Sequence, residues 1–373
     1  MSLPAVDALL AEAVHRGDPP AAQCCVLLDG APIHDGAHGC DPESVFDLAS
    51  VTKVAATTSA LALLASRRAL GLDDHVGRYL SSGAHPDLTL RALLAHRSGL
   101  PAWRPFFTRA MADPLARAIY AERPRAPLAA WARARRLVLE GVLAAPLEVP
   151  GQRVYSDLGF ITLGAVVETV AAERLHTFAR RALHPGRDLG FVDLARGRSW
   201  LDDRAVVATG VTRPREPAPG QEGRCGVPEA RRPEDPGRVD DDNAFAMGGV
   251  AGHAGLFGTA RALARFAHDA WIDDALGLGD TRRAFLEVDE GARGPPRALG
   301  FDVPTPGSSA GRLARGARVV GHLGFTGCSV WMDLDRRLVV ALLTNRTLPG
   351  RHRVEGIRAL RPAVHDAVAD ALA

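Results

Sequence analysis

Hydrophobic and polar positions repeat with two different periods along the chain, and the change of period separates predicted helices from predicted strands. Residues 5–16 repeat apolar side chains at helical spacing. Residues 23–28 form a short apolar run typical of a strand, and Asp29-Gly30 is a hairpin turn signal before a second strand at residues 31–38. The chain therefore opens with a helix and an antiparallel hairpin.

The middle of the chain is dominated by helical patterns. An apolar helix with few charges is predicted from about Ser50 to Arg68, and such a helix is buried on most of its sides. Further helices and turns are predicted at residues 72–80, 88–101, 108–145, 159–173 and 175–183. Residues 196–242 differ, because Arg, Pro, Glu, Asp and Gly become frequent, and they predict a long surface excursion in which only residues 205–209 resemble a strand.

The end of the chain returns to strands. The predicted elements there are a helix capped by Thr259 and running to Ala270, strands at 318–322, 327–333 and 338–344, and a last helix at 354–372. Strands at both ends with helices between them predict an α+β protein, in which an antiparallel sheet is flanked by helices. We expect one unit over residues 1–373, with a sheet lobe at about 1–75 and 250–373 and an inserted, mainly helical lobe at about 76–249.

Composition narrows the class of protein without changing this picture. Hydrophobic residues make up 47% of the chain and charged residues 24%, which fits a soluble globular protein with a large core. The formal net charge of +2 gives no reason to expect nucleic acid or an anionic membrane as a partner. No stretch approaches the roughly 20 apolar residues of a membrane span. The sequence does not fix the oligomeric state.

The cysteines and the N-terminus predict a cellular location. The five cysteines are scattered and include no Cys-x-x-Cys pair, as expected for free thiols in a reducing compartment. The N-terminus lacks a basic region followed by an apolar run, which is the pattern of a secretory signal. We therefore expect a cytoplasmic protein. We also expect no cofactor and no metal, because His253 lacks a second ligand at useful spacing and is predicted, like His96, to be a structural residue.

Lys53 is the most unusual residue, because it is the only lysine among 45 lysines and arginines. Arginine keeps its proton at any working pH, whereas a buried lysine can lose one and act as a base. Lys53 follows Ser50 by three positions, so the two side chains share a helix face. A Ser-x-x-Lys match is expected by chance about once in a chain of this length. The pair is a candidate nucleophile and base that needs further support.

Acyl transfer at Ser50 would need a proton shuttle and N–H donors for an oxyanion. Tyr155 precedes an apolar helix and is the candidate shuttle, although a tyrosine that packs at the edge of the core is an equally good interpretation. The segment from His322 to Gly327 leads into a strand, and its glycines allow close approach of the backbone to a ligand. The alternative for His322 is a strand-end histidine beside a glycine bulge.

These motifs, taken in order, resemble the serine β-lactamase and penicillin-binding protein superfamily. The resemblance is greatest to the branch of class C β-lactamases, D-alanyl-D-alanine carboxypeptidases and family VIII esterases. Residues 46–53, 93–101, 248–257 and 324–346 also look like that branch. The resemblance covers roughly residues 20–350 and implies a β-lactamase/transpeptidase-like fold.

The resemblance also implies roles for individual residues. Ser50 would be acylated, with Lys53 beside it as a neutral amine or proton relay, and Tyr155 would pass the proton of Ser50 to the leaving group. His322 would stand where the branch has Lys or His at the start of its third motif, and Gly324 would be the glycine of that motif. The oxyanion hole would be formed by the backbone N–H groups of Ser50 and Phe325.

Two positions depart from the pattern of the branch. Asp157 stands where asparagine is common, and a carboxylate near the lysine would favour the ammonium form of Lys53. Leu323 stands where related motifs have threonine, so a hydroxyl that could bind a substrate carboxylate is missing. His322 is also a weaker cation than lysine near neutral pH. These departures make an uncharged substrate more plausible than a penicillin or a peptide C-terminus.

The sequence therefore predicts a serine hydrolase that forms an acyl-enzyme on Ser50. Small esters or amides are the first choice of substrate, and β-lactams or D-amino-acid peptides are the second. Two alternatives remain open at this point. The chain could be a ligand-binding protein that has lost efficient chemistry, as Asp157 and Leu323 suggest, or an acyltransferase that uses the same residues.

Overall fold

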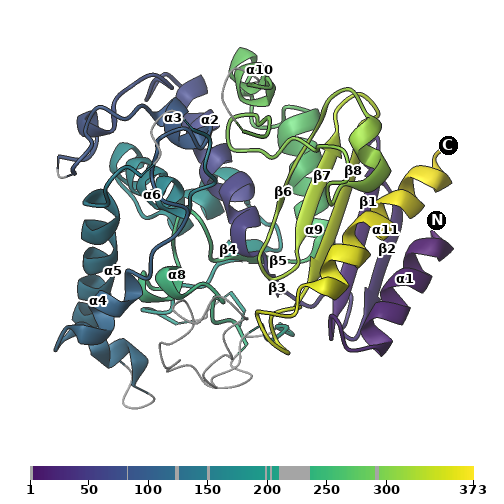
Figure 1. The fold of residues 1–373 in the computed structure, drawn as a ribbon, viewed down its shortest axis with the longest axis horizontal. Helices are drawn as coiled ribbons and strands as arrows, with labels where there is room; N and C mark the ends of the chain where they lie inside the picture. Colours follow the sequence, from purple (N-terminus) through teal and green to yellow (C-terminus); the bar gives the residue numbers. More distant parts are fainter. Residues whose placement is uncertain are drawn as a thin grey trace.

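The computed structural model describes residues 3–81, 83–121, 126–148, 152–197, 200–201, 204–209, 236–289 and 294–373. Most of the predicted surface excursion, including Cys225, lies outside these residues. Figure 1 shows a sheet with helices on both faces on one side of the molecule and a group of helices on the other. The two termini lie together at the sheet side, where α1 and α11 run next to each other.

A five-stranded antiparallel sheet has the strand order β2-β1-β8-β7-β6. Its strands are β1 (Ala22–Leu28), β2 (Ala31–His38), β6 (Val319–Leu323), β7 (Ser329–Asp333) and β8 (Leu338–Thr344). The predicted hairpin near the N-terminus and the three predicted strands near the C-terminus are therefore confirmed. The sheet joins the two ends of the chain, because β1 pairs with β8 along its whole length.

Alternate residues of the central strands face two different layers of helices. On β1, Cys24 and Val26 pack in a cluster with α1 (Pro4–His15) and α11 (Glu355–Ala371). The intervening Cys25 and Leu27 belong to the larger core, which also contains α9 (Ala260–Ala267). This period of two is the one expected for a strand that is buried on both faces. Both helical layers were predicted from sequence.

The middle of the chain forms the helical side of the molecule (Figure 1). Its elements are η3 (Val76–Arg78), α3 (Leu90–Leu94), α4 (Phe107–Ala112), η4 (Ala116–Tyr120), α5 (Leu128–Leu143), α6 (Asp157–Ala171), α7 (Leu175–Phe178), η5 (Ala179–Leu183) and α8 (Asp242–Ala246). The mainly helical character of this part was predicted, whereas its boundaries as a lobe stay a prediction. The remaining helical segments are η6 (His268–Ile272), α10 (Asp280–Leu286) and η7 (Gly311–Arg315).

A small second sheet was not predicted. It has the order β3-β5-β4 and is made of β3 (Phe46–Asp47), β5 (Leu256–Gly258) and β4 (Leu189–Phe191). Strands of two or three residues are too short to produce a period in the sequence. The strand predicted at residues 205–209 is wrong, because only Val206 forms an isolated bridge, to Val45.

The apolar helix predicted from Ser50 is three helical segments in succession. These are a 3₁₀ turn, η1 (Ala49–Val51), a π-helical turn, η2 (Lys53–Thr58), and an α-helix, α2 (Ser59–Ser66). The stretch Ala49–Ser66 is long and apolar enough to cross a membrane, which corrects the expectation that no stretch approaches a span. Since 83% of it is buried inside the protein, it is accounted for as a core helix.

Candidate active site

The turn that carries Ser50 is held by a buried carboxylate. Asp47 is fully buried at the end of β3, where it accepts hydrogen bonds from the backbone N–H of Ala49 at 2.8 Å and of Asp240 at 2.6 Å. Burial raises the pKa of Asp47 to about 7, in spite of these hydrogen bonds. Ala49 has a φ of +46°, which is strained for a residue with a Cβ. The strain and the buried carboxylate fix the backbone one residue before Ser50.

Lys53 lies fully buried beneath Ser50 and uses all three of its protons. Its Nζ donates to Ser50 Oγ at 2.9 Å, to Asp157 Oδ1 at 2.6 Å and to the His253 carbonyl at 3.2 Å. Burial lowers the pKa of Lys53, but Asp157 and Tyr155 raise it by more, so the net pKa lies above the usual value. The predicted proximity of Asp157 is confirmed, and the resting side chain is an ammonium group rather than a neutral amine.

Tyr155 lies over the same group of atoms. Its ring centroid is 4.9 Å from Lys53 Nζ, and its hydroxyl interacts with Lys53 and Ser50. Burial raises the pKa of Tyr155 more than Lys53 lowers it, so the resting phenol keeps its proton. The ring of His96 lies 4.7 Å from the tyrosine ring, and His96 Nδ1 accepts from the Ser156 N–H at 3.0 Å. His96 is thus the buried turn residue that was predicted, and it also supports the Tyr155 segment.

His322 is buried, and its surroundings favour the neutral form of the imidazole over the cation. Burial, together with Lys53 and Arg297, lowers the pKa of His322 to about 4, although Asp302 opposes the shift. Its Nδ1 lies 2.7 Å from the Leu323 carbonyl, which can only accept, so the ring proton is on Nδ1. The sequence missed this state because burial of a strand-end histidine is set by distant residues.

Gly324 and Phe325 follow His322 at the edge of the same cavity. A Cβ on Gly324 would lie 2.6 Å from the Leu48 carbonyl oxygen, so only glycine fits against the segment before Ser50. The Phe325 side chain is 50% exposed, and the guanidinium carbon of Arg346 lies 4.4 Å from its ring centroid. The loop therefore lies directly beside the turn that carries the candidate nucleophile.

The predicted residues surround one cavity of about 730 Å³. Ser50, Tyr155, Asp157, His322, Gly324 and Phe325 all line it, and Lys53 lies behind Ser50. The sequence did not identify several further lining residues, namely Trp103, Asp240, Asp241, Asp242, Arg297, Asp302, Arg346, Arg351 and Arg361. Many of these are charged and pair with each other across long sequence separations, for example Arg351 with Asp242 at 2.8 Å. Such pairs leave no local pattern in the sequence.

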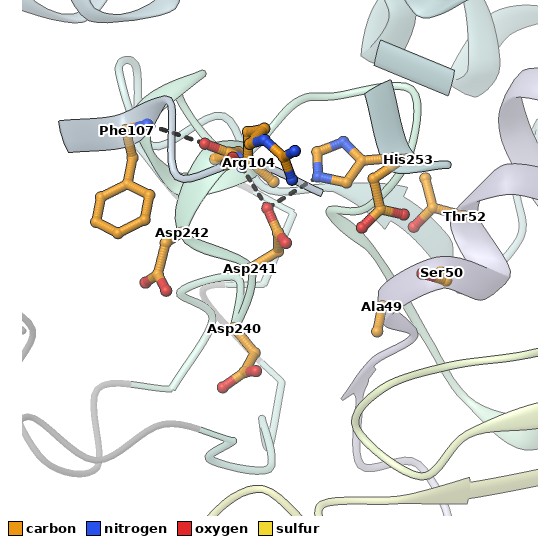
Figure 2. A network of polar contacts seen from close by, with 12 residues as sticks. Ala49, Ser50, Thr52, Arg104, Phe107, Asp240, Asp241, Asp242 and His253 are labelled. Atoms are coloured by element: carbon orange, nitrogen blue, oxygen red, sulfur yellow. Dashed lines mark hydrogen bonds and ion pairs between the residues drawn. The ribbon is translucent and has the colours of Figure 1, made fainter. Parts of the chain in front are cut away.

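His253 is part of the site rather than a remote packing residue. Figure 2 shows Asp241 pointing toward His253, while Asp240 and Asp242 point away from it, and the turn with Ala49 and Ser50 lies to one side. The His253 Nε2 is 2.8 Å from Asp241 Oδ1, and the pair holds the pKa of Asp241 at about 2, although burial opposes the shift. Sequence spacing could not reveal this contact, because Asp241 precedes His253 by twelve residues across a turn.

Asp157, Asp241 and His253 have the residue types of a metal site. Their ligand atoms lie within 4.8 Å of one another. The ammonium group of Lys53 already donates to Asp157, so a protein cation neutralises one of the two carboxylates. A second such group contains His268, but its carboxylates on Asp269 and Asp273 are paired with Arg187 and Arg337. Neither group offers a free set of ligands.

Comparison with known proteins gives consistent results. Residues 6–365 match the family model described as Beta-lactamase. A putative D-alanyl-D-alanine carboxypeptidase of Escherichia coli K12 is 28% identical over 328 residues, which cover 81% of this chain and 69% of that protein. An N-acetylmuramyl-L-alanine amidase of Bacillus subtilis is 27% identical over 365 residues, which cover 88% of this chain and 77% of that protein.

Solved structures share the fold at low sequence identity. EstCE1, a hydrolase with promiscuous acyltransferase activity, superposes with a TM-score of 0.67 at 20% identity, covering 97% of this chain and 98% of that one. A class C beta lactamase from Rhodobacter sphaeroides has a TM-score of 0.65 at 18% identity, covering 99% of both chains.

Proposed function

The chain belongs to the beta-lactamase family, whose members are serine hydrolases, and on this premise we propose that it hydrolyses small esters or amides through an acyl-enzyme on Ser50. The family and the β-lactamase/transpeptidase-like fold predicted from sequence are thereby confirmed. The observation that carries the proposal is the 2.9 Å contact between Lys53 Nζ and Ser50 Oγ at a large cavity. A serine hydroxyl held by a buried ammonium group at a cavity is an arrangement that suits a nucleophile whose developing negative charge must be stabilised.

In the first step, Ser50 Oγ attacks the substrate carbonyl carbon. The proton of Ser50 moves to the Tyr155 oxygen while the proton of Tyr155 moves to the leaving atom, so the phenol gains one proton and loses one. The bond between the carbonyl carbon and the leaving atom then breaks, and an ester on Ser50 remains. Lys53 stays charged, because its ammonium already donates to Ser50 Oγ, Asp157 and His253.

In the second step, water attacks the ester on Ser50. The water proton moves to Tyr155 and the tyrosine proton returns to Ser50 Oγ as the acyl–oxygen bond breaks. The products are the free acid and the unmodified serine. In both steps, the ammonium group of Lys53 stabilises negative charge that develops on Ser50 Oγ and on the tyrosine oxygen.

The residues of the third motif support an uncharged substrate. The neutral imidazole of His322 supplies no cation, and Leu323 supplies no hydroxyl to bind a substrate carboxylate. A second candidate is cleavage of D-amino-acid peptides or β-lactams, which the similarity to a putative D-alanyl-D-alanine carboxypeptidase favours. A panel of p-nitrophenyl esters, a chromogenic β-lactam and D-alanyl-D-alanine peptides, each assayed with the wild type and Ser50→Ala, separates the two.

Two other functions for the same site predict different outcomes. A ligand-binding protein without chemistry would be stabilised by a ligand but would show no turnover that depends on Ser50. An acyltransferase would form a new ester or amide when an alcohol or amine is added, whereas a hydrolase would release only the free acid. Product analysis with an added acceptor measures this directly. Location in the cytoplasm and the absence of nucleic-acid or membrane partners remain proposals from composition.

A further inference from the structure

A buried arginine lies behind the loop that contains Phe325. Arg361 is on α11 and is 9% exposed. Its guanidinium donates to three backbone carbonyls, those of Gly324 at 2.7 Å, Cys328 at 2.8 Å and Gly327 at 3.1 Å. The hydrogen-bond partners that the structure gives its guanidinium are backbone carbonyls and include no carboxylate. Burying a charge without a counter-charge is costly, so three well-placed carbonyls must offset that cost.

The contact with Gly324 fixes the orientation of one peptide unit. A trans peptide is planar, so its carbonyl and its N–H point in opposite directions. The Gly324 carbonyl points into the loop, where it accepts from Arg361 and from the Gly327 N–H at 3.0 Å. The N–H of the same peptide belongs to Phe325 and must point out of the loop.

The outward N–H lies on the side of the nucleophile. Gly324 packs against Leu48 and Ala49, which immediately precede Ser50, and Phe325 lines the same cavity as Ser50. The Thr326 hydroxyl donates to the Asp47 carbonyl at 2.8 Å and ties the loop to the same turn. If the Gly324–Phe325 peptide unit were flipped, its carbonyl oxygen would face the cavity and would repel an oxyanion.

The charge of Arg361 also makes the Phe325 N–H a stronger hydrogen-bond donor. A cation at a carbonyl oxygen polarises the peptide and makes its N–H a better donor, as in any chain of hydrogen bonds in a low-dielectric region. The effect needs the cation to remain charged. Burial lowers the pKa of Arg361 to about 10, which still leaves the guanidinium protonated at neutral pH.

We propose that Arg361 is a positioning residue that holds the Gly324–Phe325 peptide with its N–H directed at the oxyanion formed on attack by Ser50. The inference rests on the proposed function, because it assigns Arg361 to the oxyanion hole of that reaction. Arg361 also borders the cavity, but its guanidinium contacts three backbone carbonyls of the loop, and it acts through them.

The test replaces Arg361 with methionine and measures hydrolysis of an uncharged p-nitrophenyl ester. Loss of an oxyanion donor costs about 10²–10³-fold in kcat, and misorientation of a donor that is still present should cost less, about 10–100-fold, with KM nearly unchanged. The matched control is Arg312→Met, because the Arg312 side chain also packs on α11, where it forms ion pairs with Asp366 and Asp370 rather than with loop carbonyls. The control variant should keep wild-type kcat.

Two further measurements separate orientation from general loss of structure. A boronic acid adds to the serine and places a tetrahedral hydroxyl in the oxyanion hole, so its inhibition constant should weaken in Arg361→Met by the same factor as kcat/KM. Guanidinium at a non-denaturing concentration should restore part of kcat to Arg361→Ala but not to Ser50→Ala. Arg361→Lys keeps the charge but lacks the planar guanidinium, so its kcat should lie between those of the wild type and Arg361→Met.

Wild-type kcat in any folded Arg361 variant would overturn the proposal. A rise in KM with unchanged kcat would also overturn it, and so would a boronate affinity that stays at the wild-type level while kcat falls. If none of the three variants folds by circular dichroism, Arg361 serves global stability and the proposal is also wrong. Failure of the proposed function is a separate result, since the wild type itself would then show no Ser50-dependent turnover.

Discussion

Two buried cations flank the candidate active site, and they are held in different ways. Lys53, on the Ser50 side, donates to a carboxylate, a hydroxyl and one carbonyl. Arg361, on the side of the Phe325 loop, donates to three carbonyls. Burial opposes the charge in both cases, but Asp157 raises the pKa of Lys53, whereas burial lowers that of Arg361 to about 10.

The difference follows from what each cation must hold. The compact ammonium has three donors, one of which is directed at the Ser50 hydroxyl, so its charge can act on the oxygen that reacts. The planar guanidinium matches a set of backbone oxygens and fixes the conformation of a loop. One cation therefore acts on reacting atoms and the other on the backbone that binds the developing charge. Mutations of Lys53 and of Arg361 should therefore differ both in how far they lower activity and in which step of the reaction they affect.

The largest effect is expected from removal of the ammonium group. Lys53→Met should lower kcat/KM for an ester by about 10³-fold, because the charge that stabilises the developing negative charge on Ser50 and Tyr155 is lost. Lys53→Arg should retain more activity than Lys53→Met if the charge is what matters. Steady-state kinetics of the two variants give the comparison. Equal activity in Lys53→Met and the wild type would remove Lys53 from the mechanism.

The protonation state of Lys53 can be tested through its partner. Asp157→Asn removes a group that raises the pKa of Lys53, so the ammonium should lose its proton at lower pH in the variant. If activity needs the ammonium, the alkaline limb of kcat/KM against pH moves to lower pH in the variant. A gain of activity at neutral pH would show instead that the neutral amine acts as the base.

The same variant has a consequence for stability. The folded-state pKa of Lys53 is raised, so the pair contributes stability that is fully present below the unfolded pKa of about 10.4 and is lost as pH rises through the folded value. Asp157→Asn should therefore unfold more easily at neutral pH and should show a weaker decline above pH 10. Thermal unfolding from pH 7 to 11, with Arg312→Met as a surface control, measures both.

The smallest effect is expected at His322, because it is neutral in the resting protein. The ring of His322 should show no titration between pH 8 and pH 5, as followed by its Cε1–H signal in NMR. The depressed pKa means that its stability contribution is present above about pH 6.5 and is lost as pH falls through about 4. His322→Gln should lower kcat by less than about tenfold. A midpoint near pH 6.5 would restore His322 as a cation.

Local patterns account for what the sequence predicted correctly. Ser50 and Lys53 lie three residues apart, in the successive helical segments η1 and η2, and Tyr155 and Asp157 lie together where the strongly apolar helix α6 begins. Burial and long-range pairing account for what it missed. Arg361 interrupts an apolar face of α11 and looks like a surface arginine, although its carbonyl partners lie 33–37 residues away. The neutral state of His322 and the pairing of Asp241 with His253 depend likewise on surroundings that a linear pattern does not encode.

Covalent labelling of Ser50 tests the central claim most directly. The wild type is treated with a fluorophosphonate and, separately, with a penicillin, and intact-mass and peptide mass spectrometry locate any adduct. We expect the phosphonyl adduct on Ser50 of the wild type, none on Ser50→Ala, and slower labelling of Arg361→Met than of Arg312→Met. A folded wild-type protein that neither reagent labels, or that is labelled equally after Ser50→Ala, would contradict the account.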